Sequence, residues 1–289
     1  MKVTVLGAGI MGSGIAQAAA MAGHEVRLND ASAAALDRGA AAIETSLRRF
    51  VKAGRLSEEE AAAARRRVAC ETDLEQSATD AEVAIETISE DRDAKWDLLS
   101  RLEQVVPDQA LLATNTSQIS ITVLASVLER SAERFIGMHF FNPPVMMELC
   151  ELIPGLRTEP ATLARAREFA EGLGKTVIVC RKDSPGFITS RVAAMLRLEC
   201  LRMLEEGIAD AEDIDTALRL GFNHPMGPLE LGDFNGLDTY LQALSSLTEA
   251  YGERFRPTVG LKAMVAAGRL GRKSGEGFYK YSSDGSRIS

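Results

Sequence analysis

The chain has 289 residues, of which 46% are hydrophobic and 26% are charged. This composition is typical of folded globular proteins with one large domain or two of ordinary size. Lysine and arginine together number 33 against 41 aspartate and glutamate residues, which gives a net charge of -8. The negative balance argues against nucleic acid or anionic lipid as a partner of the whole surface. An anionic ligand therefore requires a local basic patch.

The first thirty residues are predicted to contain neither a signal peptide nor a membrane helix. Four glycines break the apolar stretch after Lys2, and charged residues follow it.

The cysteines are widely spaced, form no C-x-x-C pair and lie in apolar or helical contexts, so each is predicted to be a buried small hydrophobic residue. We expect a reducing, cytoplasmic setting. The four cysteines are Cys70, Cys150, Cys180 and Cys200.

Short apolar runs alternate with amphipathic stretches up to about residue 182. Strands that alternate with helices predict an α/β fold with a mostly parallel, doubly wound sheet. The predicted strands are 3–6, 26–28, 83–85, 111–114, 135–138, 149–153 and 177–180.

A helical hairpin is predicted between the second and third of these strands. An amphipathic helix over 43–51 is followed by Ser57 and Glu60, which form a capping box at the start of an alanine-rich helix. The hairpin interrupts the sheet order and must project from it. Residues 48–67 hold seven cationic and three acidic side chains, so we expect a local basic face that suits phosphates.

The sequence changes character after the last predicted strand. Ser184 and Pro185 offer an N-cap and a first-turn proline, and apolar residues then recur at helical spacing. Asp210 can cap a further helix, and no strand-like alternation appears before Gly277. We therefore place a domain boundary between residues 183 and 184 and expect 184–289 to be all-helical.

A glycine pattern opens the chain. Gly7, Gly9 and Gly12 follow a predicted strand at once and begin a predicted helix, the context in which G-x-G-x-x-G binds a dinucleotide in a Rossmann-type fold. Asp30 ends the next strand, where a carboxylate can bind the ribose hydroxyls and repel a 2'-phosphate. The pattern predicts NAD rather than NADP. The alternative is that the glycines only pack a helix on a strand.

Of the three histidines, His24 and His224 lie in predicted turns and have structural interpretations. His139 stands at the end of a predicted strand, at the edge of an open α/β sheet where ligands bind. Imidazole titrates near neutral pH, which suits a general base. Glu151 lies in the next predicted strand and could hold the other ring nitrogen. A purely structural histidine is the alternative.

Seven motifs in order along nearly the whole chain resemble the L-3-hydroxyacyl-CoA dehydrogenase family, especially its short bacterial 3-hydroxybutyryl-CoA dehydrogenases. The resemblance implies an NAD-binding domain over 1–183, followed by a helical substrate and dimerisation domain over 184–289. It also implies an acyl-CoA substrate and a homodimer. The motifs are GAGIMGSGIA from Gly7, Asn115-Thr116-Ser117, His139-Phe140-Phe141-Asn142-Pro143, Ser184-Pro185-Gly186-Phe187-Ile188, Met226-Gly227-Pro228-Leu229-Glu230-Leu231, Gly236-Leu237-Asp238 and Lys273-Ser274-Gly275-Glu276-Gly277-Phe278-Tyr279.

The resemblance also implies roles for single residues. His139 would take the proton of the 3-hydroxyl group, Glu151 would orient His139, and Ser117 would bind the substrate oxygen. The alternative for the charged residues is a solvated surface, and for Asn142 a turn cap. No metal ligands are predicted. The implied NAD contacts are Gly7, Gly9, Ile10, Met11, Gly12, Asp30, Glu90, Lys95, Asn142 and Lys273, and the implied CoA-substrate contacts are Ser46, Lys52, Ser117 and Ser190.

Two positions depart from the family pattern. Ser190 stands where the family carries an asparagine that helps to hold the substrate, and Glu148 stands where it commonly carries a lysine. These departures leave a second enzyme class open, a relative that acts on a hydroxy acid or a cyclic alcohol without CoA. A catalytically idle NAD-binding protein is the third alternative, and the presence of Ser117, His139 and Glu151 argues against it.

Overall fold

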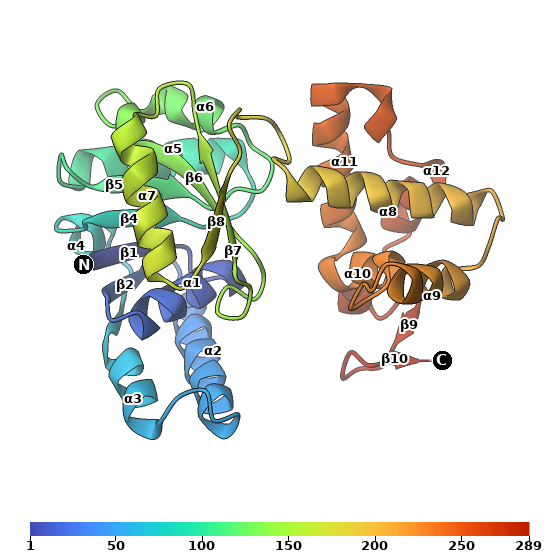
Figure 1. Ribbon diagram of the computed structural model, residues 1–289, viewed down its shortest axis with the longest axis horizontal. Helices are drawn as coiled ribbons and strands as arrows, with labels where there is room; N and C mark the ends of the chain where they lie inside the picture. The colour runs from blue at the N-terminus through green and yellow to red at the C-terminus, as the bar shows by residue number, and fades with distance from the viewer. Residues whose placement is uncertain (289) are drawn as a thin grey trace. The chain divides into compact units, whose positions relative to one another are not determined.

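The computed structural model describes residues 1–288, which form two compact units, Met1–Ser184 and the part from Pro185 onward (Figure 1). Each unit has its own apolar core. No helix in residues 1–288 combines the length and the apolar character that crossing a membrane requires.

The first unit is built on one eight-stranded sheet with the order β3-β2-β1-β4-β5-β6-β7-β8. Every neighbouring pair is parallel except β6 and β7, which are antiparallel. The predicted doubly wound, mostly parallel sheet is therefore confirmed. The strands are β1 (Lys2–Leu6), β2 (Glu25–Asn29), β3 (Val68–Glu71), β4 (Val83–Glu86), β5 (Leu111–Thr114), β6 (Phe135–Phe140), β7 (Leu149–Pro154) and β8 (Thr176–Val179).

Strand β3 was not among the predicted strands. It lies at the edge of the sheet, and the side chains of Ala69 and Cys70 are exposed there. A short run of mostly small apolar side chains gives little sequence signal, and the sequence does not show that the strand lies at the edge. The prediction that all four cysteines are buried is wrong at Cys70 for the same reason, and it holds for the other three.

Helices α2 and α3 form the projecting hairpin (Figure 1). Both pack on α1 and on each other. The predicted capping box at the start of α3 is present, since the Ser57 hydroxyl accepts the Glu60 amide and the Glu60 carboxylate accepts the Ser57 amide. The helices of this unit are α1 (Ile10–Met21), α2 (Ala33–Lys52), α3 (Glu58–Arg66), α4 (Leu74–Ala78), α5 (Arg92–Val105), α6 (Ile121–Leu124) and α7 (Pro160–Gly172), with 3-10 turns η1 (Ala125–Val127) and η2 (Ala132–Arg134).

The strand order reverses at β1, which lies between β2 and β4. The chain leaves β1 toward β2 and later returns to pair β4 on the opposite side of β1. In open α/β sheets, ligands bind at the carboxyl ends of the strands where the order reverses in this way. The loops after β1, β4, β5 and β6 meet at this edge of the sheet.

The second unit is helical, as predicted. Its core includes Leu198, Leu229, Leu244 and Leu261. The chain end adds an antiparallel pair, β9 (Lys280–Tyr281) and β10 (Arg287–Ile288), which the helical prediction did not include. The helices are α8 (Thr189–Glu205), α9 (Ala211–Gly221), α10 (Pro228–Asn235), α11 (Leu237–Tyr251) and α12 (Val259–Ala266), with 3-10 turns η3 (Glu253–Phe255) and η4 (Arg272–Ser274).

Helix α8 begins at Thr189, several residues after the N-cap predicted at Ser184. Gly186 and Phe187 have φ values of 76° and 46°, which lie in the left-handed region. A right-handed helix cannot include residues in that conformation. Downstream, the cap predicted at Asp210 is present, with its side chain accepting the amide of Asp213 at 2.9 Å.

Candidate active site

The loop between β1 and α1 approaches the loop after β4 closely. Gly7 has a φ of 104°, and a Cβ at this position would lie 3.0 Å from the carbonyl carbon of Thr87. A Cβ at Gly12 would lie 1.8 Å from the carbonyl oxygen of Gly7, so only glycine allows the helix to start this near the turn. A Cβ at Gly9 would have no atom within 4 Å. The loop therefore offers open space in front of the first amides of α1, which suits a pyrophosphate.

Asp30 follows β2 and is fixed at the same loop. One carboxylate oxygen accepts the amide of Ala8 at 2.9 Å and the other accepts the amide of Ser32 at 2.9 Å. A carboxylate oxygen can accept more than one hydrogen bond, so both oxygens can still bind ribose hydroxyls. Ile10 is 76% exposed at the start of α1, and Met11 is half-buried. These residues fit an NAD site at the switch point of the sheet.

His139 and Glu151 are directly opposite each other in the antiparallel pair of β6 and β7. The Nδ1 atom of His139 lies 2.7 Å from a carboxylate oxygen of Glu151. Glu151 is completely buried and His139 is 7% exposed. The ring of Phe141 lies against the imidazole, with 4.6 Å between the ring centroids. The structure thus brings together the two side chains predicted to form the catalytic pair, and the carboxylate can stabilise an imidazolium.

Ser117 lies in the loop after β5, next to the carboxyl ends of β4 and β6. One oxygen of the Glu90 carboxylate accepts the amide of Ser117 at 2.9 Å, the amide of Gln118 at 3.0 Å and the hydroxyl of Thr116 at 2.5 Å. Glu90 is therefore the residue that organises the loop carrying Ser117.

The same loop is tied to the strand of the histidine. The side-chain oxygen of Asn115 accepts the amide of Phe140 at 2.8 Å, one residue beyond His139. The loop of Ser117 and the end of β6 are therefore held together at the edge where the ligand is expected.

Lys95 was expected to contact NAD, but its side chain is 1% exposed. Its ammonium donates to Glu86 at 2.6 Å and to the carbonyl of Ile88 at 3.3 Å, and it lies 3.5 Å from the second oxygen of Glu90. Burial raises the pKa of the Glu86 carboxyl, and the Lys95 ammonium opposes that effect. This placement favours an indirect role for Lys95. Glu86 belongs to no motif in the sequence, and its only signal is a carboxylate at the end of an apolar strand.

The remaining predicted contacts are less constrained. Asn142 is exposed in the loop after β6. In the second unit, Lys273 forms an ion pair with Asp238, with its ammonium 2.6 Å from both carboxylate oxygens. Ser190 lies in the first turn of α8. The roles of these three residues stay predictions.

The basic residues of the hairpin do not form the single face that was expected. Ser46 and Lys52 are both on α2, and six helical positions place them roughly 120° apart around the axis. Because α2 and α3 form a hairpin, their carboxyl ends lie at opposite ends of it. The cations divide accordingly into Arg48, Arg49, Lys52 and Arg55 near the tip and Arg65, Arg66 and Arg67 near the sheet. Only the tip group accompanies the predicted CoA contacts.

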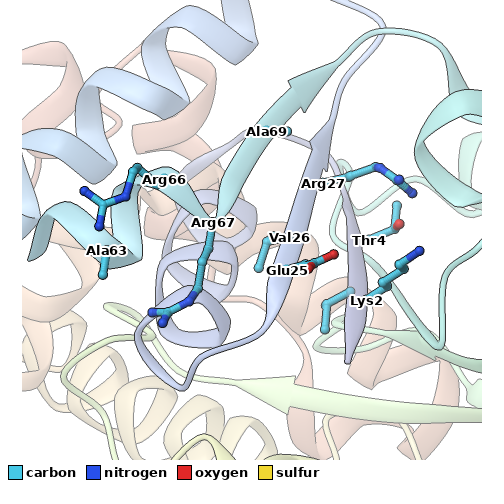
Figure 2. A pocket seen from close by; sticks show the side chains of 10 residues that line it. Lys2, Thr4, Glu25, Val26, Arg27, Ala63, Arg66, Arg67 and Ala69 are labelled. Carbon is cyan, nitrogen blue, oxygen red and sulfur yellow. The ribbon is translucent and has the colours of Figure 1, made fainter. Parts of the chain in front are cut away.

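A hollow of about 470 Å³ lies beside β1, β2 and β3 and holds the cations Lys2, Arg27, Arg66 and Arg67 among its lining residues (Figure 2). Lys2 and Arg27 share the carboxylate of Asp80, and Arg67 donates to a backbone carbonyl. Figure 2 shows the side chains of Arg27 and Arg66 pointing in opposite directions. The hollow thus lacks a converging set of cations, and we assign no anion site to it.

Comparisons with known proteins agree on one family. Residues 2–184 match the family model described as 3-hydroxyacyl-CoA dehydrogenase, NAD binding domain, and residues 186–281 match 3-hydroxyacyl-CoA dehydrogenase, C-terminal domain. A probable 3-hydroxybutyryl-CoA dehydrogenase of Deinococcus radiodurans is 45% identical over 97% of this chain and 100% of its own length. A 3-hydroxybutyryl-CoA dehydrogenase of Bradyrhizobium diazoefficiens is 44% identical over 97% of this chain and 95% of its own.

Solved structures show the same similarity. The (S)-3-hydroxybutyryl-CoA dehydrogenase of Ralstonia eutropha is 42% identical with a TM-score of 0.92, over 97% of this chain and 99% of that chain. A diketoreductase is similar at 30% identity and a TM-score of 0.83, over 97% and 99% of the two chains. With both family models matched in order and relatives above 40% identity over nearly the whole length, this chain belongs to the 3-hydroxyacyl-CoA dehydrogenase family.

Proposed function

We propose that this protein interconverts a short (S)-3-hydroxyacyl-CoA, with 3-hydroxybutyryl-CoA as the expected substrate, and the corresponding 3-oxoacyl-CoA. The observation that carries the proposal is the buried pair of His139 and Glu151, 2.7 Å apart at the sheet edge where the glycine loop also lies. Relatives named for this reaction, at 41% identity or more over nearly the full length, support the same substrate class.

NAD supplies the acceptor for the hydrogen and electron pair that leave C3 of the substrate. His139 takes the hydroxyl proton, and because Nδ1 faces Glu151 we assign this transfer to Nε2. The buried carboxylate of Glu151 holds the ring orientation and stabilises the imidazolium that results. Ser117 donates a hydrogen bond to the substrate oxygen from a loop that Glu90 holds in place.

The open space at Gly9 and the anchored carboxylate of Asp30 support NAD binding by this loop. For CoA, the basic tip of the hairpin near Lys52 supports binding of its phosphates. The substrate contact proposed for Ser190 rests on its position in the motif that opens α8.

Oxidation of NADH with acetoacetyl-CoA against acetoacetate tests the proposal. We expect turnover with the thioester and little with the free acid. Equal activity on both would favour the relative that acts without CoA, a possibility that the similarity to a diketoreductase keeps in view. No activity on either would contradict the proposed function.

We also propose that the protein is a homodimer in a reducing, cytoplasmic setting. The second unit by itself has an apolar groove of about 620 Å³ whose lining includes Met195, Leu196 and Phe222, and Phe222 is 73% exposed. Apolar surfaces of this kind are typical of protein–protein interfaces. For the cellular setting, the four free cysteines fit a reducing compartment. Sedimentation velocity should give a dimer for the wild type and a monomer for Phe222→Glu, whereas a monomeric wild type at micromolar concentration would contradict the proposal.

A further inference from the structure

A buried ion pair lies beneath the loop that carries Ser117. Glu86 is the last residue of β4 and is completely buried. Its carboxylate accepts the Lys95 ammonium at 2.6 Å, the Thr114 hydroxyl at 2.6 Å and the amide of Ile88 at 2.7 Å. Lys95 comes from the first turn of α5 and is 1% exposed. The pair therefore joins β4, β5 and α5 directly behind the predicted site.

Glu90 connects this pair to Ser117. One oxygen of its carboxylate lies 3.5 Å from the Lys95 ammonium, and the other accepts the two amides and the hydroxyl of the loop 116–118. The charge of Lys95 is thus shared between a fully buried acid and the acid that holds the loop. We propose that the Glu86–Lys95 pair is a positioning element that acts through Glu90 to fix Ser117, an inference that rests on the proposed function.

Loop ordering alone does not require such a pair. Glu103, on α5, accepts the amides of Glu129, Arg130 and Ser131 at 2.7 to 3.0 Å, together with the hydroxyl of Ser131 at 2.7 Å. That loop precedes β6 and so lies at the amino end of the parallel strands, opposite the predicted site. In the described part of the chain, its carboxylate is held by these donors without a lysine. By contrast, Lys95 and the second acid, Glu86, are found beneath the loop that has to place Ser117.

A contribution to the stability of the fold is a weak explanation for the presence of the Glu86–Lys95 pair. Taking an ammonium and a carboxylate out of water costs about as much as their attraction returns, and replacing both with neutral residues often leaves the fold intact. Removing one partner alone strands a buried charge and is strongly destabilising. The informative variant is therefore the double replacement Glu86→Gln with Lys95→Met, which leaves Glu90 in place without its cation.

The double variant is compared with Glu103→Gln, a matched control at the loop far from the site. We expect the folded double variant to lose about 10- to 100-fold in kcat with acetoacetyl-CoA, the loss typical of a small misplacement of a substrate-binding group, with KM changed less than threefold. Its amide protons at Ser117 and Gln118 should exchange faster. Glu103→Gln should speed exchange at Glu129 to Ser131 and leave kcat unchanged.

The variant Ser117→Ala distinguishes an action of the Glu86–Lys95 pair through Ser117 from a merely structural role of the pair. If the pair acts through Ser117, adding the double replacement to Ser117→Ala should lower kcat less than twofold further, because interacting sites are not additive. An equal loss in both backgrounds, wild-type kcat in the folded double variant, or unchanged exchange at Ser117 and Gln118 would overturn the inference. A wild type inactive on acetoacetyl-CoA would instead refute the proposed function, and the exchange rates would still decide whether the pair orders Ser117.

Discussion

Replacing Glu151 with glutamine tests the charge at the centre of the proposed mechanism. The amide keeps the size of the side chain and can accept a hydrogen bond from Nδ1 of His139, so the ring orientation is preserved. What disappears is the negative charge that faces the imidazolium across 2.7 Å. Because Glu151 is completely buried and His139 nearly so, water screens this interaction weakly.

The magnitude follows from the geometry. Opposite unit charges whose centres are about 4 Å apart interact by roughly 4 kcal/mol at an effective dielectric constant of 20. The positive charge is only partly developed in the transition state, so we expect the loss of about half to three quarters of that value. Since 1.4 kcal/mol is a factor of ten in rate, this loss of about 2 to 3 kcal/mol should lower kcat by about 30- to 140-fold.

The assay is steady-state oxidation of NADH with acetoacetyl-CoA, with the Kd for NADH measured separately by fluorescence. His139→Gln should lower kcat by about 10² to 10⁴, the usual range for loss of a general base. The combined variant should be little worse than His139→Gln alone, because the two residues act as one unit. Near wild-type kcat in Glu151→Gln, with intact NADH binding, would refute the assignment of Glu151 to charge stabilisation.

Three further outcomes are expected. The wild type should prefer NADH over NADPH by about 100-fold or more in kcat/KM, because the Asp30 carboxylate and the 2'-phosphate are like charges, whose contact costs several kcal/mol. Asp30→Ser should bring the two kcat/KM values closer together, whereas comparable wild-type values for NADH and NADPH would show that Asp30 does not select the cofactor. Ser190→Asn should raise kcat/KM for the short substrate by up to about 100-fold, the equivalent of the 1.5 to 3 kcal/mol of one charge-assisted hydrogen bond, and Ser190→Ala should not raise it. Unchanged kcat/KM in both variants would place Ser190 outside the site. Hydrogen bonds from Arg27 and Lys2 lower the pKa of Asp80 to about 2, so its stabilisation is present above pH 4 and is lost as the pH falls through 2. In urea titrations, Asp80→Asn should lower the free energy of unfolding by about 1 kcal/mol at pH 7, after discounting for its surface position, and the difference from wild type should shrink to a small fraction of that value near pH 2. An equal difference at both pH values would contradict the assignment.

Much of the fold could be predicted because the central strands are buried on both faces. All four residues of β4 and all four of β5 are buried, and both strands are continuous apolar runs apart from their last residue. Strand β3 has a similar short apolar run, Val68 to Cys70, but it lies at the edge of the sheet, and the sequence does not show that Ala69 and Cys70 are exposed there. The helix start predicted at Ser184 and Pro185 is wrong, because Gly186 and Phe187 adopt a left-handed conformation that the sequence does not display.

Some features of the candidate site could be predicted from the sequence and others could not. The spacing of His139 and Glu151 placed them on consecutive strands, but only the antiparallel register makes them direct neighbours. The pair of Glu86 and Lys95 joins a strand end to the first turn of a helix, and no periodic pattern links those positions. Residues that meet through tertiary packing carry no local signal. The NAD contact that the resemblance implies for Lys95 stays a prediction, and the structure shows its side chain 1% exposed and paired with Glu86.

One arrangement recurs along the carboxyl edge of the sheet. Asp30 after β2 holds the glycine loop of β1, Glu86 of β4 holds Thr114 of β5, and Glu151 of β7 holds His139 of β6. These three groups are thus each held by an acid that lies in or directly after a neighbouring strand. We expect the phosphates of NAD at the first amides of α1, where the backbone N–H groups favour an anion, and those of CoA at cations such as Lys52 near the hairpin tip. The acids thus hold the groups of the proposed chemistry in place, whereas the binding of the anionic parts of the ligands is expected from backbone amides and cations.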